Sequence, residues 1–281
     1  MELLVLGGTG FVGSQLCKRA EMDSIKYRSI GSKECDLLSL SDARNLFSTS
    51  SSPLNIVFMS TSGLPGRDSL ETCMDNIRMT SNIIEALRGF EVETFIFFSS
   101  SDVYGRPQTV PVSEEAPLNP ENWYGLSKLT SEKMLLLCPE LNNVLTILRL
   151  PGIYTQDALA PNAFCAMYRK ILESGKVTCF GDGASLRDIV EADELSKMVL
   201  HLSTHGKAIG VVNIATGESI SVREAIEAMR RQSGRDIQIE WKMGNGRDFD
   251  LVLDISKLKN MLPDILLTPF KTVVNKFPKS I

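Results

Sequence analysis

Near its start the chain reads Leu3-Leu4-Val5-Leu6-Gly7-Gly8-Thr9-Gly10-Phe11-Val12-Gly13, and this run determines the class of fold. The apolar residues predict a buried strand, and the residues after the glycines predict a helix to about Ala20. Glycine permits the tight turn between them and lets the backbone approach a pyrophosphate, which the N–H groups of the helix would bind. The run fits GxGxxG counted from Gly8 or GxxGxxG counted from Gly7, and both predict a dinucleotide-binding loop.

Apolar strands and amphipathic helices alternate from this loop to Leu150. The further strands are expected at 26–30, 55–59, 94–98 and 144–148, and the further helices at 42–47, 75–87 and 124–137, the first of them capped by Ser41. Continuous apolar strands separated by helices indicate a parallel sheet that is covered on both faces. The predicted class is therefore α/β, with a Rossmann-type doubly wound parallel sheet.

Pro and Gly residues interrupt this rhythm after Leu150, and a smaller C-terminal α/β lobe is expected there. Helices are expected at 162–173, 193–202, 221–232, 254–262 and 269–276, and strands at 177–180 and 211–214. Ser221 and Glu224 have the spacing of a capping box. We assign residues 1–150 to a dinucleotide-binding domain, to which about 186–215 return, and residues 151–185 and 216–281 to a substrate-binding lobe.

Composition excludes several classes of function. The net charge of -4 leaves no electrostatic footprint for nucleic acid. No apolar stretch approaches the roughly 20 residues of a membrane span, and the N-terminus lacks a signal-peptide pattern. Six cysteines without a CxxC pattern and only two histidines predict core thiols and no metal site. A cytoplasmic protein is expected.

The end of the second strand bears on the cofactor. It reads Ser29-Ile30-Gly31-Ser32-Lys33, where a carboxylate would repel a 2′-phosphate and Ser or Lys would accept one. This favours NADP, and NAD stays possible because Glu34 is close. Asp36 could accept a hydrogen bond from the adenine amine, or it could be an ordinary loop carboxylate.

Two further features suggest chemistry at a hydroxyl or a ketone. Tyr124 and Lys128 lie at i and i+4, so they share one face of a helix. There the ammonium group would lower the pKa of the phenol, which could then exchange a proton with a substrate oxygen. Upstream, Ser99-Ser100-Ser101 emerges where an apolar strand ends, at the edge of the sheet where α/β proteins bind ligands.

Together these motifs resemble the extended short-chain dehydrogenase/reductase family of nucleotide-sugar epimerases, dehydratases and reductases. The matching motifs, in order, are the glycine loop, Cys35-Asp36-Leu37, Ser100-Ser101-Asp102-Val103-Tyr104-Gly105, Tyr124-Gly125-Leu126-Ser127-Lys128, Arg149-Leu150-Pro151-Gly152-Ile153-Tyr154, Gly181-Asp182-Gly183 with Arg187-Asp188, Asn213-Ile214-Ala215-Thr216-Gly217 and Lys257. The likeness covers nearly the whole chain.

The resemblance implies roles for particular residues. Tyr124 would be the acid/base, Lys128 its partner and a ligand of the cofactor ribose, and Ser100 the serine of the site, with Ser101 as the alternative. The cofactor contacts would be Gly7, Gly10, Phe11, Val12, Gly13, Ser32, Lys33, Asp36, Leu37, Ser60, Tyr124, Lys128 and Pro151. The contacts of a nucleotide-diphosphate sugar would be Ser100, Ser101, Asp102, Arg187 and Arg247, the two arginines holding the pyrophosphate.

One departure from the family pattern narrows the chemistry. The dehydratases have an Asp-Glu pair after the catalytic Ser/Thr, and Ser101-Asp102 stands there in this chain. We therefore favour an NAD(P)-dependent oxidoreductase that reduces a 4-keto sugar. An NAD-dependent nucleotide-sugar 4-epimerase is the alternative, and a non-catalytic dinucleotide-binding regulator is an alternative of another class. The resemblance also implies a homodimer.

Overall fold

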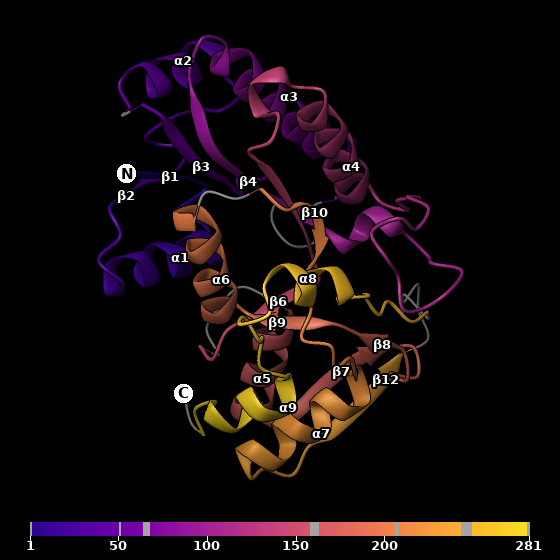
Figure 1. Ribbon diagram of the computed structural model, residues 1–281. Helices are drawn as coiled ribbons and strands as arrows, with labels where there is room; N and C mark the ends of the chain where they lie inside the picture. Colours follow the sequence, from indigo (N-terminus) through magenta and orange to yellow (C-terminus); the bar gives the residue numbers. More distant parts are fainter. Residues whose placement is uncertain are drawn as a thin grey trace. The chain divides into compact units, whose positions relative to one another are not determined.

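The computed structural model describes residues 2–50, 52–63, 68–157, 163–205, 208–242 and 249–279. The chain forms two compact units (Figure 1). Unit 1 contains Met1–Gly105, Pro117–Leu150 and Ser196–Val212, and unit 2 contains Arg106–Ala116, Pro151–Leu195 and Asn213–Ile281.

Unit 1 is built on one six-stranded sheet with the strand order β10-β5-β4-β3-β1-β2. Its strands are β1 (Leu3–Leu6), β2 (Tyr27–Ile30), β3 (Leu54–Phe58), β4 (Val92–Ser100), β5 (Leu145–Leu150) and β10 (Gly210–Asn213). The recorded pairings of β1 with β2 and β3, of β3 with β4 and of β4 with β5 are all parallel. Parallel neighbours need crossover connections, which is why a helix follows nearly every strand.

Helices cover both faces of this sheet, as the ribbon shows (Figure 1). Helices α2 (Leu40–Ser48), α3 (Leu70–Leu87) and α4 (Trp123–Leu136) share an apolar core with one face. Helix α1 (Phe11–Met22) and α6 (Ala192–His205) lie on the other. Two short 3-10 helices, η1 (Ser101–Tyr104) and η2 (Pro139–Leu141), follow β4 and α4. The predicted doubly wound parallel sheet is confirmed.

Two helices of unit 1 begin elsewhere than the sequence predicted. Ser39, and not Ser41, caps α2 by accepting a hydrogen bond from the backbone N–H of Asp42. Helix α3 begins at Leu70, five residues before the predicted Asp75, because Ser69 and Thr72 form a capping box there. An apolar stripe could not locate this start, since Leu70 and Met74, near the beginning of α3, are 55% and 56% exposed.

Unit 2 has no large sheet among its described residues. Its strands pair two by two: β6 (Gly152–Tyr154) with β9 (Ile189–Glu191), β7 (Lys176–Phe180) with β12 (Gln238–Lys242), and β8 (Leu186–Arg187) with β11 (Ile220–Ser221). Its helices are α5 (Ala163–Ser174), α7 (Val222–Ser233), α8 (Ser256–Met261) and α9 (Phe270–Val273), which runs into η3 (Val274–Lys276). This is the predicted smaller α/β lobe.

An aromatic cluster lies at the centre of unit 2. The ring of Tyr154 is 5.0 Å from that of Phe270 and 6.0 Å from that of Phe277, and Tyr168 packs on Phe277 at 5.1 Å. Aromatic rings at such distances bury much area per residue. The sequence predicted the capping box of α7, which Ser221 and Glu224 form. It did not predict β6, β8, β9 and β11, which have only two or three residues and show no period, nor β12, in which polar residues alternate with Ile239 and Trp241.

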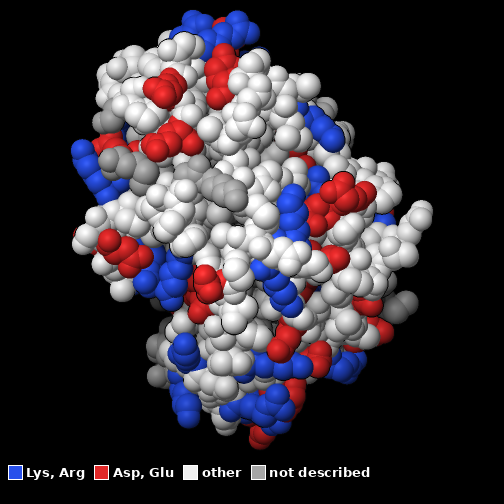
Figure 2. Space-filling model, in the orientation of Figure 1, with Lys and Arg blue, Asp and Glu red and all other residues white. Residues whose placement is uncertain are grey.

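The surface of the described chain agrees with its composition. Lys and Arg lie among Asp and Glu over the face shown in Figure 2. No helix in the described ranges has the length and apolar character to cross a membrane. All six cysteines are free and buried, as expected of core thiols.

Candidate active site

The loop between β1 and α1 has the geometry that only glycine allows. Gly7 has a φ of +93°, and a Cβ on it would lie 2.8 Å from the backbone nitrogen of Ser60. A Cβ on Gly13 would lie 2.1 Å from the carbonyl oxygen of Gly7. These approaches pack the loop tightly against β3 and against the first turn of α1. Gly7, Gly13 and Ser60 are thus brought together, as the sequence predicted.

The N-terminus of α1 differs from the starts of several other helices. Its N-cap, Gly10, makes no side-chain capping hydrogen bond, and the first turn, which begins with Phe11 and Val12, contains no acid. In contrast, side chains cap α2, α3, α4 and α7. A helix start without a capping side chain or an acid presents N–H groups and positive potential to an anion. This region therefore fits the pyrophosphate of a dinucleotide.

A carboxylate lies at the end of β2. Glu34 accepts a hydrogen bond of 2.9 Å from the backbone N–H of Gly31 through Oε2. A Cβ on Gly31 would lie 3.0 Å from that oxygen and 2.4 Å from the hydroxyl of Thr9 in the glycine loop. Ser32 and Lys33 are exposed in the same turn. The turn thus brings the carboxylate of Glu34, which the sequence placed only near this point, back to the strand end and against the glycine loop.

Two predicted cofactor contacts follow this turn. Asp36 is exposed, and its Oδ1 accepts a local hydrogen bond of 3.0 Å from the backbone N–H of Leu38. Leu37 is buried in the core beneath the sheet. One oxygen of Asp36 is therefore already engaged within its own loop.

Three consecutive residues of β4 contact three residues on one face of α4. The Nζ of Lys128 donates to the carbonyl oxygen of Phe98 at 2.8 Å. The hydroxyl of Ser99 donates to the carboxylate of Glu132. The hydroxyls of Ser100 and Tyr124 are hydrogen-bonded to each other.

Tyr124, Lys128 and Glu132 are spaced by four residues, so they lie along one side of the helix. The structure therefore brings the predicted Ser100, Tyr124 and Lys128 together. It adds Glu132, which the sequence reading did not single out.

The N-terminus of α4 is held in place by two acidic groups. Asn122 accepts a hydrogen bond of 2.6 Å from the backbone N–H of Gly125 and donates one of 2.9 Å to Asp102. Asp68 accepts hydrogen bonds from the backbone N–H groups of Trp123 at 3.2 Å and of Tyr124 at 2.8 Å. Carboxylates stabilise the start of a helix. Asp68 was missed because no local spacing connects it to a helix that begins 55 residues later.

Helix α3 supports α4 from the side. Asn76 donates to the hydroxyl of Ser127 at 3.3 Å, and the hydroxyls of Thr80 and Ser131 are 2.8 Å apart. All four side chains are buried. Polar side chains in such an interface fix its register because each needs its partner. The helix that carries Tyr124 is therefore anchored by α3, by β4 and by its own caps.

The pKa values of Tyr124 and Lys128 differ from those that the sequence suggested. Desolvation around its hydroxyl raises the pKa of Tyr124, and the nearby Asp102 raises it further, although the residue as a whole is only half-buried. Burial lowers the pKa of Lys128 to about 8, against the opposing effect of the Glu132 carboxylate. The pKa of the phenol is therefore raised in the structure and not lowered as the sequence suggested, because desolvation is the largest effect on it. Tyr124 is a neutral phenol at pH 7.

The remaining predicted contacts of substrate and cofactor are divided between the two units. Ser101 is buried in η1, and Asp102 binds Asn122 through one carboxylate oxygen. Pro151 and Arg187 belong to unit 2, where Arg187 donates to the carbonyl oxygens of Leu186 and Phe249. Arg247 lies outside the described residues.

Comparison with known proteins agrees with this geometry. A model described as the NAD dependent epimerase/dehydratase family matches residues 3–215. The chain belongs to this family. It is therefore an NAD(P)-dependent enzyme of the nucleotide-sugar epimerase and reductase type, and the resemblance to extended short-chain dehydrogenases/reductases is confirmed.

Two relatives and one solved structure are informative. The chain is 33% identical over 209 residues to a putative UDP-glucose 4-epimerase of Methanocaldococcus jannaschii, covering 71% of this chain and 68% of that protein. It is 28% identical over 294 residues to an uncharacterized UDP-glucose epimerase, YtcB, of Bacillus subtilis, covering 93% and 92%. The structure of RMD from Pseudomonas aeruginosa complexed with NADPH shares the fold, with a TM-score of 0.83, 23% identity and coverage of 98% and 97%.

Proposed function

We propose that this enzyme is an NAD-dependent 4-epimerase of a nucleotide-activated sugar. The observation that carries the proposal is the group Ser100, Tyr124 and Lys128, held between β4 and α4, in a chain whose relatives are named as UDP-glucose epimerases. The reductase that the sequence reading favoured uses the same group and has less support from relatives. A regulator without catalysis would not need a buried Lys128 beside a tyrosine.

Tyr124 and Ser100 act on the oxygen at C4 of the sugar. A bound nicotinamide would accept hydride from C4 and return it to the opposite face of the ring. Tyr124 must first give up its phenol proton; the phenolate then takes the proton of the C4 hydroxyl when a ketone forms, and the phenol so produced returns it when the hydroxyl forms again. Ser100 donates a hydrogen bond to the same oxygen and fixes its direction. Lys128 supplies a positive charge, which eases the removal of the phenol's proton.

Charge at the end of β2 supports NAD rather than NADP. The carboxylate of Glu34 lies beside Gly31 and the glycine loop, where the adenosine ribose of a dinucleotide is bound in this fold. A carboxylate accepts hydrogen bonds from ribose hydroxyls and repels a 2′-phosphate. The exposed Ser32 and Lys33, which favoured NADP in the sequence, would act only if Glu34 were turned away.

Glu34→Gln tests the cofactor assignment. The variant should lose about tenfold of its preference for NAD over NADP, because it loses the charge and keeps the shape of the side chain. The dissociation constants of both dinucleotides, measured by fluorescence titration, give the ratio. Glu21→Gln is the matched control, since it makes the same change at an exposed glutamate of α1 that has no predicted role in cofactor binding. Tighter binding of NADP than of NAD to the unaltered protein would contradict the assignment.

Incubation with sugar nucleotides tests the function itself. UDP-glucose or UDP-galactose, with a trace of NAD, should be converted to a mixture of the two C4 epimers without net change in absorbance at 340 nm. A 4-keto sugar nucleotide supplied with NADPH should not cause stoichiometric oxidation of the coenzyme. Stoichiometric oxidation without epimerisation would establish the reductase instead.

A homodimer is also proposed, from the family resemblance and from exposed apolar side chains on the two packed helices α3 and α4. On α3, Leu70 and Met74 are 55% and 56% exposed, and on α4 Leu126 is 39% exposed. Such residues on adjoining helices favour a second protein surface over water.

A further inference from the structure

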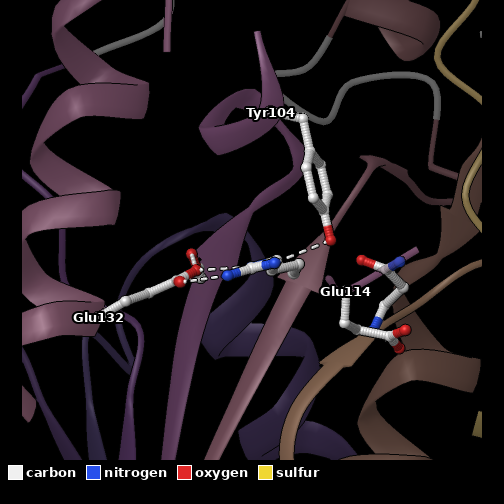
Figure 3. Close-up of polar contacts among 6 residues, drawn as sticks. Tyr104, Glu114 and Glu132 are labelled. Carbon is white, nitrogen blue, oxygen red and sulfur yellow. Dashed lines mark hydrogen bonds and ion pairs between the residues drawn. The ribbon is translucent and has the colours of Figure 1, made fainter. Parts of the chain in front are cut away.

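A buried ion pair lies directly behind the candidate catalytic group. Arg149, at the end of β5, holds Glu132 of α4 with a forked contact: Nε lies 3.1 Å from Oε1 and Nη2 lies 2.8 Å from Oε2. The side chains are 4% and 1% exposed. The third nitrogen, Nη1, donates to the hydroxyl of Tyr104 at 2.9 Å. Figure 3 shows the guanidinium group between the labelled Glu132 and Tyr104.

This pair is connected to the reacting groups on two sides. Glu132 follows Lys128 by one helical turn, and Lys128 follows Tyr124 by one turn. On β4, the hydroxyl of Ser99 donates to Glu132, and Ser100 is the next residue. Glu132 therefore holds the strand that carries the serine against the helix that carries the tyrosine and the lysine.

Stability alone does not account for these charges. An apolar pair of similar volume is often as stable as a buried ion pair, or more stable, because two charges must be removed from water. The carboxylate is nevertheless present one turn from a buried lysine that has few other sources of negative charge. This position suggests that the charge of Glu132 matters for the charge of Lys128.

We propose that Glu132 and Arg149 are positioning residues for the reaction: Glu132 joins β4 to α4 and places a negative charge one helical turn from the buried Lys128, while Arg149 holds the Glu132 carboxylate in place. The role of this pair in the reaction rests on the proposed function. The physical claim, that this pair sets the charge of Lys128, stands by itself and is measured on the protein without substrate.

The pKa of Lys128 depends on the charged and polar groups around it in unit 1. On its own helix they are Tyr124 and Glu132. From β4 come the carbonyl oxygen of Phe98, the ring of Phe97 at 5.0 Å from Nζ, and the hydroxyls of Ser99 and Ser100. From η1 comes Asp102, which acts on Tyr124, and from β5 comes Arg149 behind Glu132. From α3 the neutral Asn76 and Thr80 face the helix.

Two variants that break the same ion pair should shift the pKa of Lys128 in opposite directions. In Glu132→Gln the carboxylate is lost and the arginine charge remains, so the pKa of Lys128 should fall by at least about one unit. In Arg149→Met the carboxylate loses the guanidinium that offsets its charge, so the pKa of Lys128 should rise by about one unit. Carbon-13 NMR of the lysine ε carbons against pH measures this, with Lys128 assigned by its absence in Lys128→Met.

A purely structural role predicts a different pattern. Both variants would then disturb packing alike, and the pKa of Lys128 would move in the same direction in both or not at all, which overturns the proposal. If a single variant does not fold, the double variant Glu132→Gln/Arg149→Met decides. Without either charge, the pKa of Lys128 should still fall, by less than in Glu132→Gln, because the lost carboxylate is the nearer charge. An unchanged value in the double variant also overturns the proposal. These titrations are independent of turnover, so a failed epimerase assay leaves their result standing.

Discussion

The two faces of helix α4 reverse the usual arrangement of a helix in a globular protein. Its inner face buries charged and hydroxyl side chains, among them Lys128, Ser131 and Glu132. Its outer side exposes Trp123 at 42%, Leu126 at 39% and Leu136 at 47%. A surface helix normally buries its apolar side and exposes its polar one. The proposed chemistry at Tyr124 would account for the inner face, and the proposed homodimer would account for the outer face.

Removal of the Tyr124 hydroxyl tests the inner face most severely. Tyr124→Phe should lower kcat about a thousandfold, because the general acid and base is lost, and should leave the binding of dinucleotide nearly unchanged. Steady-state kinetics and a fluorescence titration of cofactor give the two results. Tyr27→Phe, which removes a hydroxyl from β2, is the matched control and should keep full activity. Undiminished turnover in Tyr124→Phe would exclude the proposed mechanism.

Charges placed on the outer face test the dimer. Met74→Glu with Leu126→Glu would bury two unpaired carboxylates in an apolar contact, which should raise the dissociation constant of the dimer at least about a hundredfold. Analytical ultracentrifugation over a range of concentrations measures it. Met22→Glu on α1 is the control, since Met22 is 66% exposed on another helix. An unaltered protein that sediments as a monomer at every concentration would remove the explanation offered for this face.

The buried charge of Lys128 should cost stability in a pH-dependent manner. Burial lowers the pKa of Lys128 from 10.5 to about 8, so between these values the folded protein binds fewer protons than the unfolded chain. The contribution of this group to stability therefore rises with pH across that window. Lys128→Met abolishes the titration. Its free energy of unfolding relative to wild type should be most favourable at pH 7 and should decline by about 2 kcal/mol by pH 10.

Urea unfolding at the two pH values provides the measurement. Lys133→Met, which removes an exposed lysine from the same helix, is the matched control and should show no such trend. A stability difference for Lys128→Met that stays constant or grows with pH would show that the ammonium is not penalised by burial.

The sequence predicted what local spacing encodes. The glycine loop lies within a window of eleven residues, and Tyr124 with Lys128 occupies one turn, so both could be recognised without a structure. The parallel sheet followed from apolar runs of ordinary length. These features depend on the backbone or on neighbours in the chain, and the structure confirms the loop and the sheet.

Partners that are distant in the sequence could not be predicted. Asp68 binds a helix start 55 residues away, and Arg149 meets Glu132 across 17 residues and two different elements. The sequence placed Glu34 near the end of β2, but only the structure shows that the turn returns its carboxylate to Gly31. The raised pKa of Tyr124 depends on burial, which no spacing reveals. The candidate catalytic residues could thus be named from the sequence, but the groups that surround them could not.

The fate of the hydrogen at C4 during reaction in D₂O tests the central claim most directly. UDP-glucose is incubated with the enzyme and a trace of NAD, and the C4 epimer is examined by proton NMR. We predict an epimeric product that keeps the original hydrogen at C4, because hydride leaves and returns within one site while Tyr124 exchanges only the oxygen-bound proton. Deuterium at a carbon of the product, or stoichiometric reduction of NAD without a C4 epimer, would contradict the account.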